Sequence, residues 1–126
     1  MNAEKKLRVF LIEDAPRIRS VLIEVLQQSE NIEVIGFAES ESDALEKLRE
    51  LEWDVAIVDI SLREGSGLAI LSALKNDGCD YGPRLVFTGS PSKALKARTL
   101  ALGAEGLFDK SRELDQLVNY IQGLVH

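Results

Sequence analysis

The sequence lacks the features of secreted and membrane-inserted proteins. Its one cysteine, Cys79, cannot form an internal disulfide, which agrees with the reducing environment of the cytoplasm. No apolar run approaches the length of a membrane span, and residues 1–6 lack the apolar core and cleavage site of a secretory signal. We therefore expect a soluble, cytoplasmic protein without membrane insertion.

Positive charge is also scarce. The chain has 15 Lys and Arg residues against 21 Asp and Glu residues, which gives a formal net charge of −6. This balance argues against nonspecific binding to DNA or to anionic membranes, so we expect no direct nucleic-acid partner. With 126 residues, 45% of them hydrophobic and 29% charged, the chain has the size and composition of one globular domain. We expect a single domain over residues 1–126.

Five short apolar runs alternate with five stretches of helical periodicity. The runs typical of strands lie at residues 7–12, 32–38, 55–58, 85–87 and 106–109. Helical spacing follows at about residues 16–26, 44–51, 68–76, 90–102 and 114–124. The fourth helix is expected to begin at Ser90 as its N-cap, with Pro91 in the first helical position. Strict alternation implies right-handed crossovers and a parallel sheet that is covered on both faces. The expected fold class is α/β, a doubly wound five-stranded parallel sheet of (βα)5 type in the flavodoxin-like order 2-1-3-4-5.

Polar residues follow the strands that this order places side by side. Glu13 and Asp14 follow the first strand, Asp59 the third, Thr88 the fourth and Lys110 the fifth. The carboxyl ends of parallel strands meet at one edge, where open α/β sheets bind their ligands, so these five residues should gather there. Each alone could be a turn residue, a helix start or a solvated charge. Their joint arrival at one edge favours a functional site.

The residue types in this group indicate phosphoryl chemistry with a metal. Three carboxylates within a few ångströms repel one another and favour a bound cation. Oxygen ligands without His or Cys suit Mg²⁺, with Mn²⁺ as a possible substitute. Once the metal neutralises it, Asp59 can act as a nucleophile toward phosphorus and form an aspartyl phosphate, while Lys110 and the Thr88 hydroxyl bind the phosphoryl oxygens.

On these residues the chain resembles the receiver domains of two-component response regulators, including the stand-alone chemotaxis type, along essentially its whole length. The family's acidic pair matches Glu13-Asp14, its phospho-acceptor matches Asp59, its switch hydroxyl matches Thr88 and its lysine matches Lys110. The later Gly67 also fits. The motifs are specific as a set and weak one by one.

The resemblance implies phosphoryl transfer from a histidine kinase or a histidine phosphotransfer protein to Asp59. It implies that Asp14, Asp59 and the backbone carbonyl of Ser61 coordinate Mg²⁺, and that Glu13 acts through water. Self-phosphoryl transfer and slow autodephosphorylation would be the only reactions of such a signalling domain. Phosphorylation would switch the binding of a downstream protein through the face formed by helix four, strand five and helix five, and dimerisation on phosphorylation is possible.

Three positions depart from the family pattern. Arg63 and Ser111 stand where receiver domains usually have proline, and Leu107 stands where an aromatic switch residue is usual. Phe108 is adjacent, but neighbours in a strand point to opposite faces, so it should not substitute for that residue. Without proline we expect a trans Lys110–Ser111 bond, with Ser111 free to cap the last helix.

Two other function classes remain open. An aspartate-nucleophile phosphatase of the haloacid dehalogenase type also uses Asp, Thr or Ser, Lys and Mg²⁺. A chain that resembled this family would carry Asp-x-Asp after its first strand. Here Asp59-Ile60-Ser61 follows the third strand instead. The other class is a binding module that works without phosphorylation, and the retained acidic group argues against it.

Overall fold

Five parallel strands form one sheet in the computed structural model, which describes residues 5–125. The strands are β1 (Leu7–Ile12), β2 (Ile32–Ala38), β3 (Val55–Val58), β4 (Arg84–Thr88) and β5 (Gly106–Asp109). Their order in space is β2-β1-β3-β4-β5, which confirms the predicted fold class. The ends of the expected 1–126 domain, residues 1–4 and 126, lie outside the described residues.

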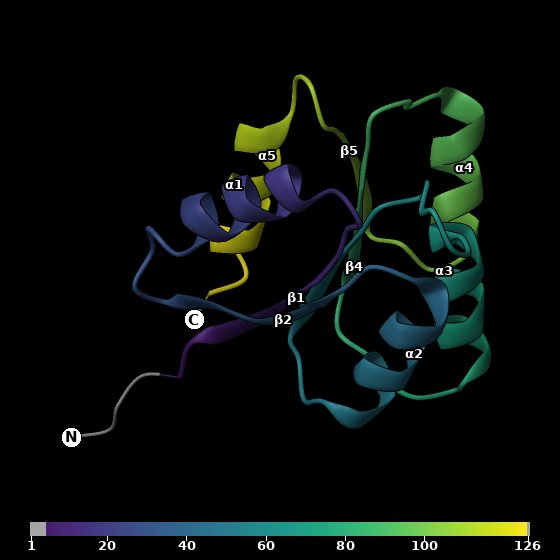
Figure 1. Ribbon diagram of the computed structural model, residues 1–126, viewed down its shortest axis with the longest axis horizontal. Coiled ribbons are helices and arrows are strands. Elements are labelled where there is room, and N and C mark those ends of the chain that lie inside the picture. The colour runs from purple at the N-terminus through teal and green to yellow at the C-terminus, as the bar shows by residue number, and fades with distance from the viewer. Residues whose placement is uncertain (1–4, 126) are drawn as a thin grey trace.

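Five helices cover the two faces of the sheet. They are α1 (Pro16–Leu26), α2 (Glu41–Glu50), α3 (Gly67–Asn76), α4 (Lys93–Ala101) and α5 (Leu114–Gln122). Helices α1 and α5 lie on one side, and α2, α3 and α4 lie on the other (Figure 1). None of the helices within residues 5–125 has the length and apolarity that crossing a bilayer requires.

Strand alternation builds a separate core on each face. Val9 and Leu11 of β1 belong to the cluster with the apolar residues of α1 and α5, whereas Phe10 and Ile12 belong to the cluster with α2 and α3. All four residues of β3 are buried, as expected for a central strand that is covered on both sides. Strands β1 and β3, two of the inner strands, therefore give the residues that follow them a rigid base.

One helix start and one helix cap differ from their sequence-based predictions. Helix α4 begins at Lys93, and its N-cap is Ser92, whose hydroxyl accepts the Leu95 N–H at 3.0 Å. The prediction of a start at Ser90 and Pro91 was wrong because a second serine lies two residues later and makes the capping hydrogen bond. The Ser90 N–H instead lies against Thr88 Oγ1 at 3.3 Å.

The last helix begins at Leu114, as predicted, but Ser111 does not cap it. Its N-cap position is Glu113, and both the N–H and the hydroxyl of Ser111 donate to Asp109 Oδ1, at 2.9 and 2.8 Å. The capping role predicted for Ser111 was wrong because Asp109, two residues earlier, takes up its hydroxyl. The Lys110–Ser111 bond is trans, as predicted, and no cis peptide bond occurs in the described part of the chain.

Candidate functional site

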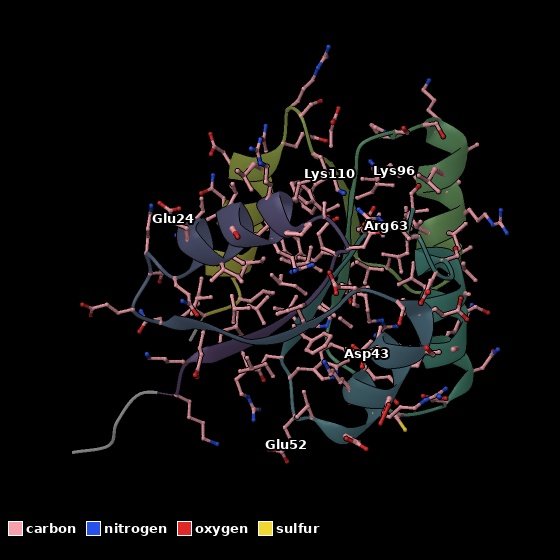
Figure 2. The ribbon with its side chains drawn as sticks, in the orientation of Figure 1. Glu24, Asp43, Glu52, Arg63, Lys96 and Lys110 are labelled. Carbon is pink, nitrogen blue, oxygen red and sulfur yellow. The ribbon has the colours of Figure 1, made fainter. Side chains whose placement is uncertain are left out.

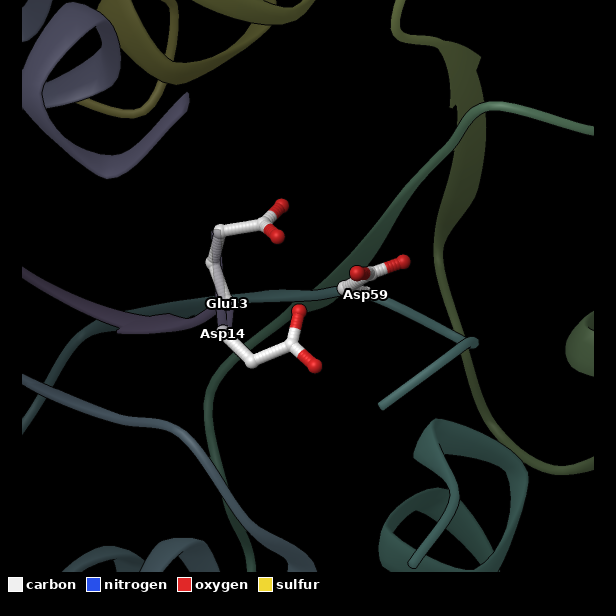
Figure 3. A group of neighbouring side chains, drawn as sticks. All are labelled: Glu13, Asp14 and Asp59. Carbon is white, nitrogen blue, oxygen red and sulfur yellow. The ribbon is translucent and has the colours of Figure 1, made fainter. Parts of the chain in front are cut away.

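Three carboxylates meet where β1 and β3 end. The Glu13 N–H continues the β1–β2 ladder by donating to the Ala38 carbonyl at 3.0 Å, and the Asp59 N–H donates to the Ile12 carbonyl at 2.9 Å. One carboxylate oxygen from each of Glu13, Asp14 and Asp59 lies within 4.8 Å of the others. The side chains of Glu13 and Asp14 both extend toward Asp59 (Figure 3). Glu13 and Asp59 are buried, whereas Asp14 is half-buried.

Lys110 reaches this group from the end of β5. Its Nζ lies 3.1 Å from Asp59 Oδ2 and 2.7 Å from Glu13 Oε1. The pairing with Glu13 was not predicted from the sequence, and Glu13 gives the shorter contact. The Lys110 N–H also donates to the Thr88 carbonyl at 2.9 Å, so the β4–β5 pairing delivers both residues to the same edge.

The electrostatics of the site reflect an excess of acid. Burial raises the pKa of Glu13, and the negative charge of Asp59 raises it further. The hydrogen bond from Lys110 lowers this pKa but does not offset the two other effects. Burial alone would lower the pKa of Lys110, but the hydrogen bond to Glu13 and the charge of Asp59 outweigh it and raise that pKa. Lys110 therefore stays charged, and the site favours additional positive charge.

Thr88 and Ser61 complete the set of predicted residues. Thr88 is buried at the end of β4, and its hydroxyl oxygen accepts the Ser90 N–H. Ser61 is exposed, and its N–H donates to Asp59 Oδ1 at 3.3 Å. At Gly67, a Cβ atom would lie 2.2 Å from the Asp59 carbonyl oxygen, so only glycine lets α3 begin this close to the acceptor strand.

The residues that depart from the family pattern have definite places. Leu107 packs with the core on the α2 and α3 side, whereas Phe108 packs on the α1 and α5 side, with its ring 6.0 Å from that of Tyr120. The prediction that Phe108 does not take the position of the aromatic residue is confirmed. The Arg63 N–H donates to Asp14 Oδ2 at 2.7 Å. Sequence reasoning missed this contact because a backbone donor in a loop leaves no signal in residue type.

The donor set fits a hard divalent cation. Mg²⁺ and Mn²⁺ both accept carboxylate and carbonyl oxygens, and Mg²⁺ takes one or two carboxylates while retaining several waters. Lys110 contacts two of the three carboxylates, so a single positive charge faces three negative ones, and burial has already raised the pKa of Glu13. A divalent cation held by Asp14 and Asp59 would offset this excess.

The comparisons with known proteins agree on one family. The sequence model of the response regulator receiver domain matches residues 9–122. A protein-glutamate methylesterase/protein-glutamine glutaminase of Clostridium acetobutylicum is 32% identical over 94% of this chain and 36% of its own length. The uncharacterized transcriptional regulatory protein YvfU of Bacillus subtilis is 31% identical over 94% of this chain and 59% of its own. The chain thus spans between about a third and three-fifths of these relatives.

Solved structures share the fold at low sequence identity. A LuxR-family two-component response regulator from Aurantimonas superimposes with a TM-score of 0.87 at 22% identity, covering 95% of this chain and 85% of the other. The response regulator domain of Thermotoga maritima CheB gives 0.83 at 21%, over 95% and 93%. The Mn²⁺-bound form of response regulator Rcp1 gives 0.78 at 23%, over 94% and 91%.

Proposed function

This chain belongs to the response regulator receiver domain family, and from that membership we propose that it accepts a phosphoryl group on Asp59 and so switches the binding of a protein partner. The supporting observation is the buried meeting of Glu13, Asp14 and Asp59 with Lys110 at the end of the sheet. The proposed donor is the phosphohistidine of a kinase or of a phosphotransfer protein. The whole of residues 1–126 is proposed to act as one receiver domain, and the lone Cys79 fits a cytoplasmic location.

The proposed transfer uses one carboxylate oxygen of Asp59 as the nucleophile. An electron pair of that oxygen forms the new bond to phosphorus, the bond from phosphorus to the donor's imidazole nitrogen breaks, and the imidazole leaves as the neutral base once it is protonated. Bound Mg²⁺ would supply charge neutralisation for the phosphoryl oxygens. Asp14, Asp59 and the Ser61 carbonyl would hold it, with Glu13 acting through water.

Lys110 and Thr88 take the remaining roles in this proposal. Lys110 already contacts Asp59 before transfer and would keep a charge-assisted contact with the phosphoryl group. Thr88 would donate its hydroxyl to a phosphoryl oxygen, a bond that exists only after transfer. One such bond contributes about 1.5–3 kcal/mol, whereas a near-complete population reversal needs about 5.5 kcal/mol. We therefore expect a partial switch.

Mass measurement separates this function from its two alternatives. The wild-type chain is incubated with Mg²⁺ and a small acyl phosphate, and the intact mass and the released phosphate are followed. A gain of one phosphoryl group that decays slowly is expected. Rapid release of phosphate without accumulation would indicate a phosphatase, and an unchanged mass would indicate a binding module that works without phosphorylation. Either of those results would overturn the proposal.

The proposed switch runs through the start of α4 and not through Leu107. Leucine has no hydroxyl or ring to exchange between buried and exposed positions. Helix α4 packs weakly against the rest of the domain, because Thr99 is its one buried residue. The segment from Thr88 to α4 can therefore move at a low cost in free energy. Amide exchange on the free and phosphorylated forms should change from Thr88 to Leu95. Changes confined to Leu107 and α5 would contradict this route.

A further inference from the structure

The loop between Asp59 and α3, residues 60–66, carries the carbonyl proposed as a metal ligand. Ser61 and Ser66 face each other across this loop in an antiparallel bridge, and the Gly67 N–H donates to the Ile60 carbonyl at 3.0 Å. This hydrogen bond uses the carbonyl before Ser61, so the Ser61 carbonyl lies outside it. The position of that carbonyl therefore depends on how the returning arm of the loop, residues 64–66, is held.

Helix α2 holds the returning arm through one residue, Glu41. Its carboxylate Oε1 accepts the Ser66 N–H at 3.1 Å, and its own N–H donates to the Glu64 carbonyl at 3.0 Å. Gly65 lies between these two bonds with φ of +90°, and a Cβ atom there would lie 2.2 Å from Glu41 Cβ. Glu41 thus fixes the loop by its side chain and its backbone together, at van der Waals contact.

The outgoing arm of the same loop is held by a proposed metal ligand. Asp14 Oδ2 accepts the Arg63 N–H at 2.7 Å, so the loop is fastened to Asp14 on one side and to Glu41 on the other. If the Glu41 carboxylate is withdrawn, the Glu64 carbonyl keeps its bond to the Glu41 N–H, but the Ser66 N–H loses its acceptor, and the Ser61 carbonyl opposite Ser66 can move.

We propose that Glu41 is a positioning residue for the metal site. It sets the Ser61 carbonyl and the Asp14 carboxylate by holding residues 64–66, and it acts through the loop without touching the metal. This inference rests on the proposed function, because it takes Asp14, Asp59 and Ser61 as the ligands. It adds a residue from an element, α2, that supplies none of them.

Two conservative substitutions separate positioning from charge. Glu41→Gln removes the negative charge but keeps an oxygen at the same reach, so it should keep most of the wild-type Mg²⁺ affinity. Glu41→Asp keeps the charge but withdraws the carboxylate by one methylene, and it should weaken Mg²⁺ binding about tenfold, as is typical of groups that orient a ligand. Glu46→Gln and Glu46→Asp, on an exposed position of α2, are the matched controls and should leave affinity unchanged.

Mg²⁺ affinity is measured by calorimetric titration of the full chain without a phosphodonor, and amide exchange of Ser66 is measured by NMR in the metal-free form. Glu41→Asp should accelerate Ser66 exchange, whereas Glu41→Gln should not. In acyl-phosphate labelling, Glu41→Asp should raise the Mg²⁺ concentration for half-maximal rate by the same factor, and saturating Mg²⁺ should restore the rate toward that of wild type.

Several results would overturn the inference. They are equal affinity of Glu41→Asp and wild type, a loss in Glu41→Gln as large as in Glu41→Asp, an equal loss in the Glu46 controls, and unchanged Ser66 exchange in Glu41→Asp. Each of these leaves the proposed phosphorylation of Asp59 intact if the wild type still binds Mg²⁺ and is still labelled. A wild-type chain that binds no Mg²⁺ would instead remove the metal from the proposed function and this inference with it.

Discussion

At each end of the sheet one cation contacts two acids, but the surroundings of the two groups differ strongly. At the carboxyl end, Lys110 contacts Glu13 and Asp59 at 2.7 and 3.1 Å. At the amino end, Arg8 contacts Glu52 and Asp54, both at 3.2 Å. Lys110 and Glu52 mark these opposite ends in Figure 2.

Burial gives the two groups opposite character. The acid side chains are 3% and 5% exposed at the carboxyl end, against 88% and 35% at the amino end. Burial raises the pKa of Glu13, and its bond to Lys110 does not cancel this effect. Burial also tends to raise the pKa of Asp54, but there the hydrogen bonds from Arg8 outweigh it and the pKa is lowered.

This difference separates an ionic group that stabilises the fold from one that favours a ligand. The ionised Asp54 carboxylate gains more from its contacts with Arg8 than it loses in solvation, so its charge is already compensated without a ligand. Glu13 loses more in solvation than Lys110 returns, so a divalent cation would relieve the excess of negative charge at this end. Functional sites commonly hold such unfavourable arrangements at a cost in stability.

The largest expected effect is on phosphorylation, when the aspartate at either end of β3, Asp59 or Asp54, is replaced by asparagine. Asp59→Asn should abolish acyl-phosphate labelling, because the amide keeps the shape and removes the nucleophile. Asp54→Asn, the same change at the other end of β3, should leave labelling at the wild-type rate. Intact mass after incubation with Mg²⁺ and acyl phosphate measures both. Labelling of Asp59→Asn at the wild-type extent would place the acceptor elsewhere.

The next largest effect is on the free energy of unfolding, when the cation of each ionic group, Lys110 or Arg8, is removed. Lys110→Met leaves two buried carboxylates facing each other and should lower the free energy of unfolding by about 3 kcal/mol, as when one partner of a buried pair is lost. Arg8→Met should cost much less, because its partners remain in contact with water. Urea unfolding of both variants in metal-free buffer gives the comparison. Equal losses would show that burial does not distinguish the two ends.

Metal binding provides a third contrast. Asp14→Ala removes a proposed Mg²⁺ ligand and the acceptor for the Arg63 N–H, so it should weaken Mg²⁺ binding tenfold or more. Glu52→Ala removes an acid from the exposed group and should leave the affinity unchanged. Titration calorimetry on the two variants and the wild type decides. An Asp14→Ala chain with wild-type affinity would remove Asp14 from the site.

The sheet order could be predicted from the strict alternation of strands and helices, and the meeting of the polar residues then followed from their places at the strand ends. In a parallel sheet, a residue one step beyond a buried run has its place fixed by the run itself, as Asp59 has after Val55–Val58. Topology then brings the strand ends to one edge. The trans Lys110–Ser111 bond and the opposite faces of Leu107 and Phe108 followed from equally local rules.

Contacts that depend on loop paths could not be predicted in this way. Two such contacts are the hydrogen bond from the Ser66 N–H to Glu41 and the one from the Arg63 N–H to Asp14. Both use backbone donors in a loop, and no residue pattern in the sequence encodes their positions. The predicted caps of α4 and α5 were also wrong. At α4 it is Ser92 and not Ser90 that accepts the helix N–H, and at α5 no side chain caps the first turn, because the Ser111 hydroxyl donates to Asp109 instead.

The smallest expected effect is the pH dependence of stability, and it should have opposite sign at the two ends. The pKa of Asp54 is lowered from its ordinary value of 3.8, so the unfolded chain takes up the proton first as pH falls. The stability from Asp54 is therefore full above that value and lost as pH drops through the lowered pKa. Since Asp54 is about one-third exposed, we expect less than about 1 kcal/mol from it.

Glu13 should act in the other direction. Because its pKa is raised from 4.5, the folded chain holds the proton at pH values where the unfolded chain has released it. Its favourable contribution is complete below 4.5 and is lost as pH rises through the raised pKa. Urea unfolding across this range in the presence of a chelator should show that Glu13→Gln flattens the decline above pH 4.5, whereas Asp54→Asn flattens the decline on the acid side. If both variants flatten the same limb, the two ionic groups respond alike to protons, and burial does not set the character of the carboxyl end.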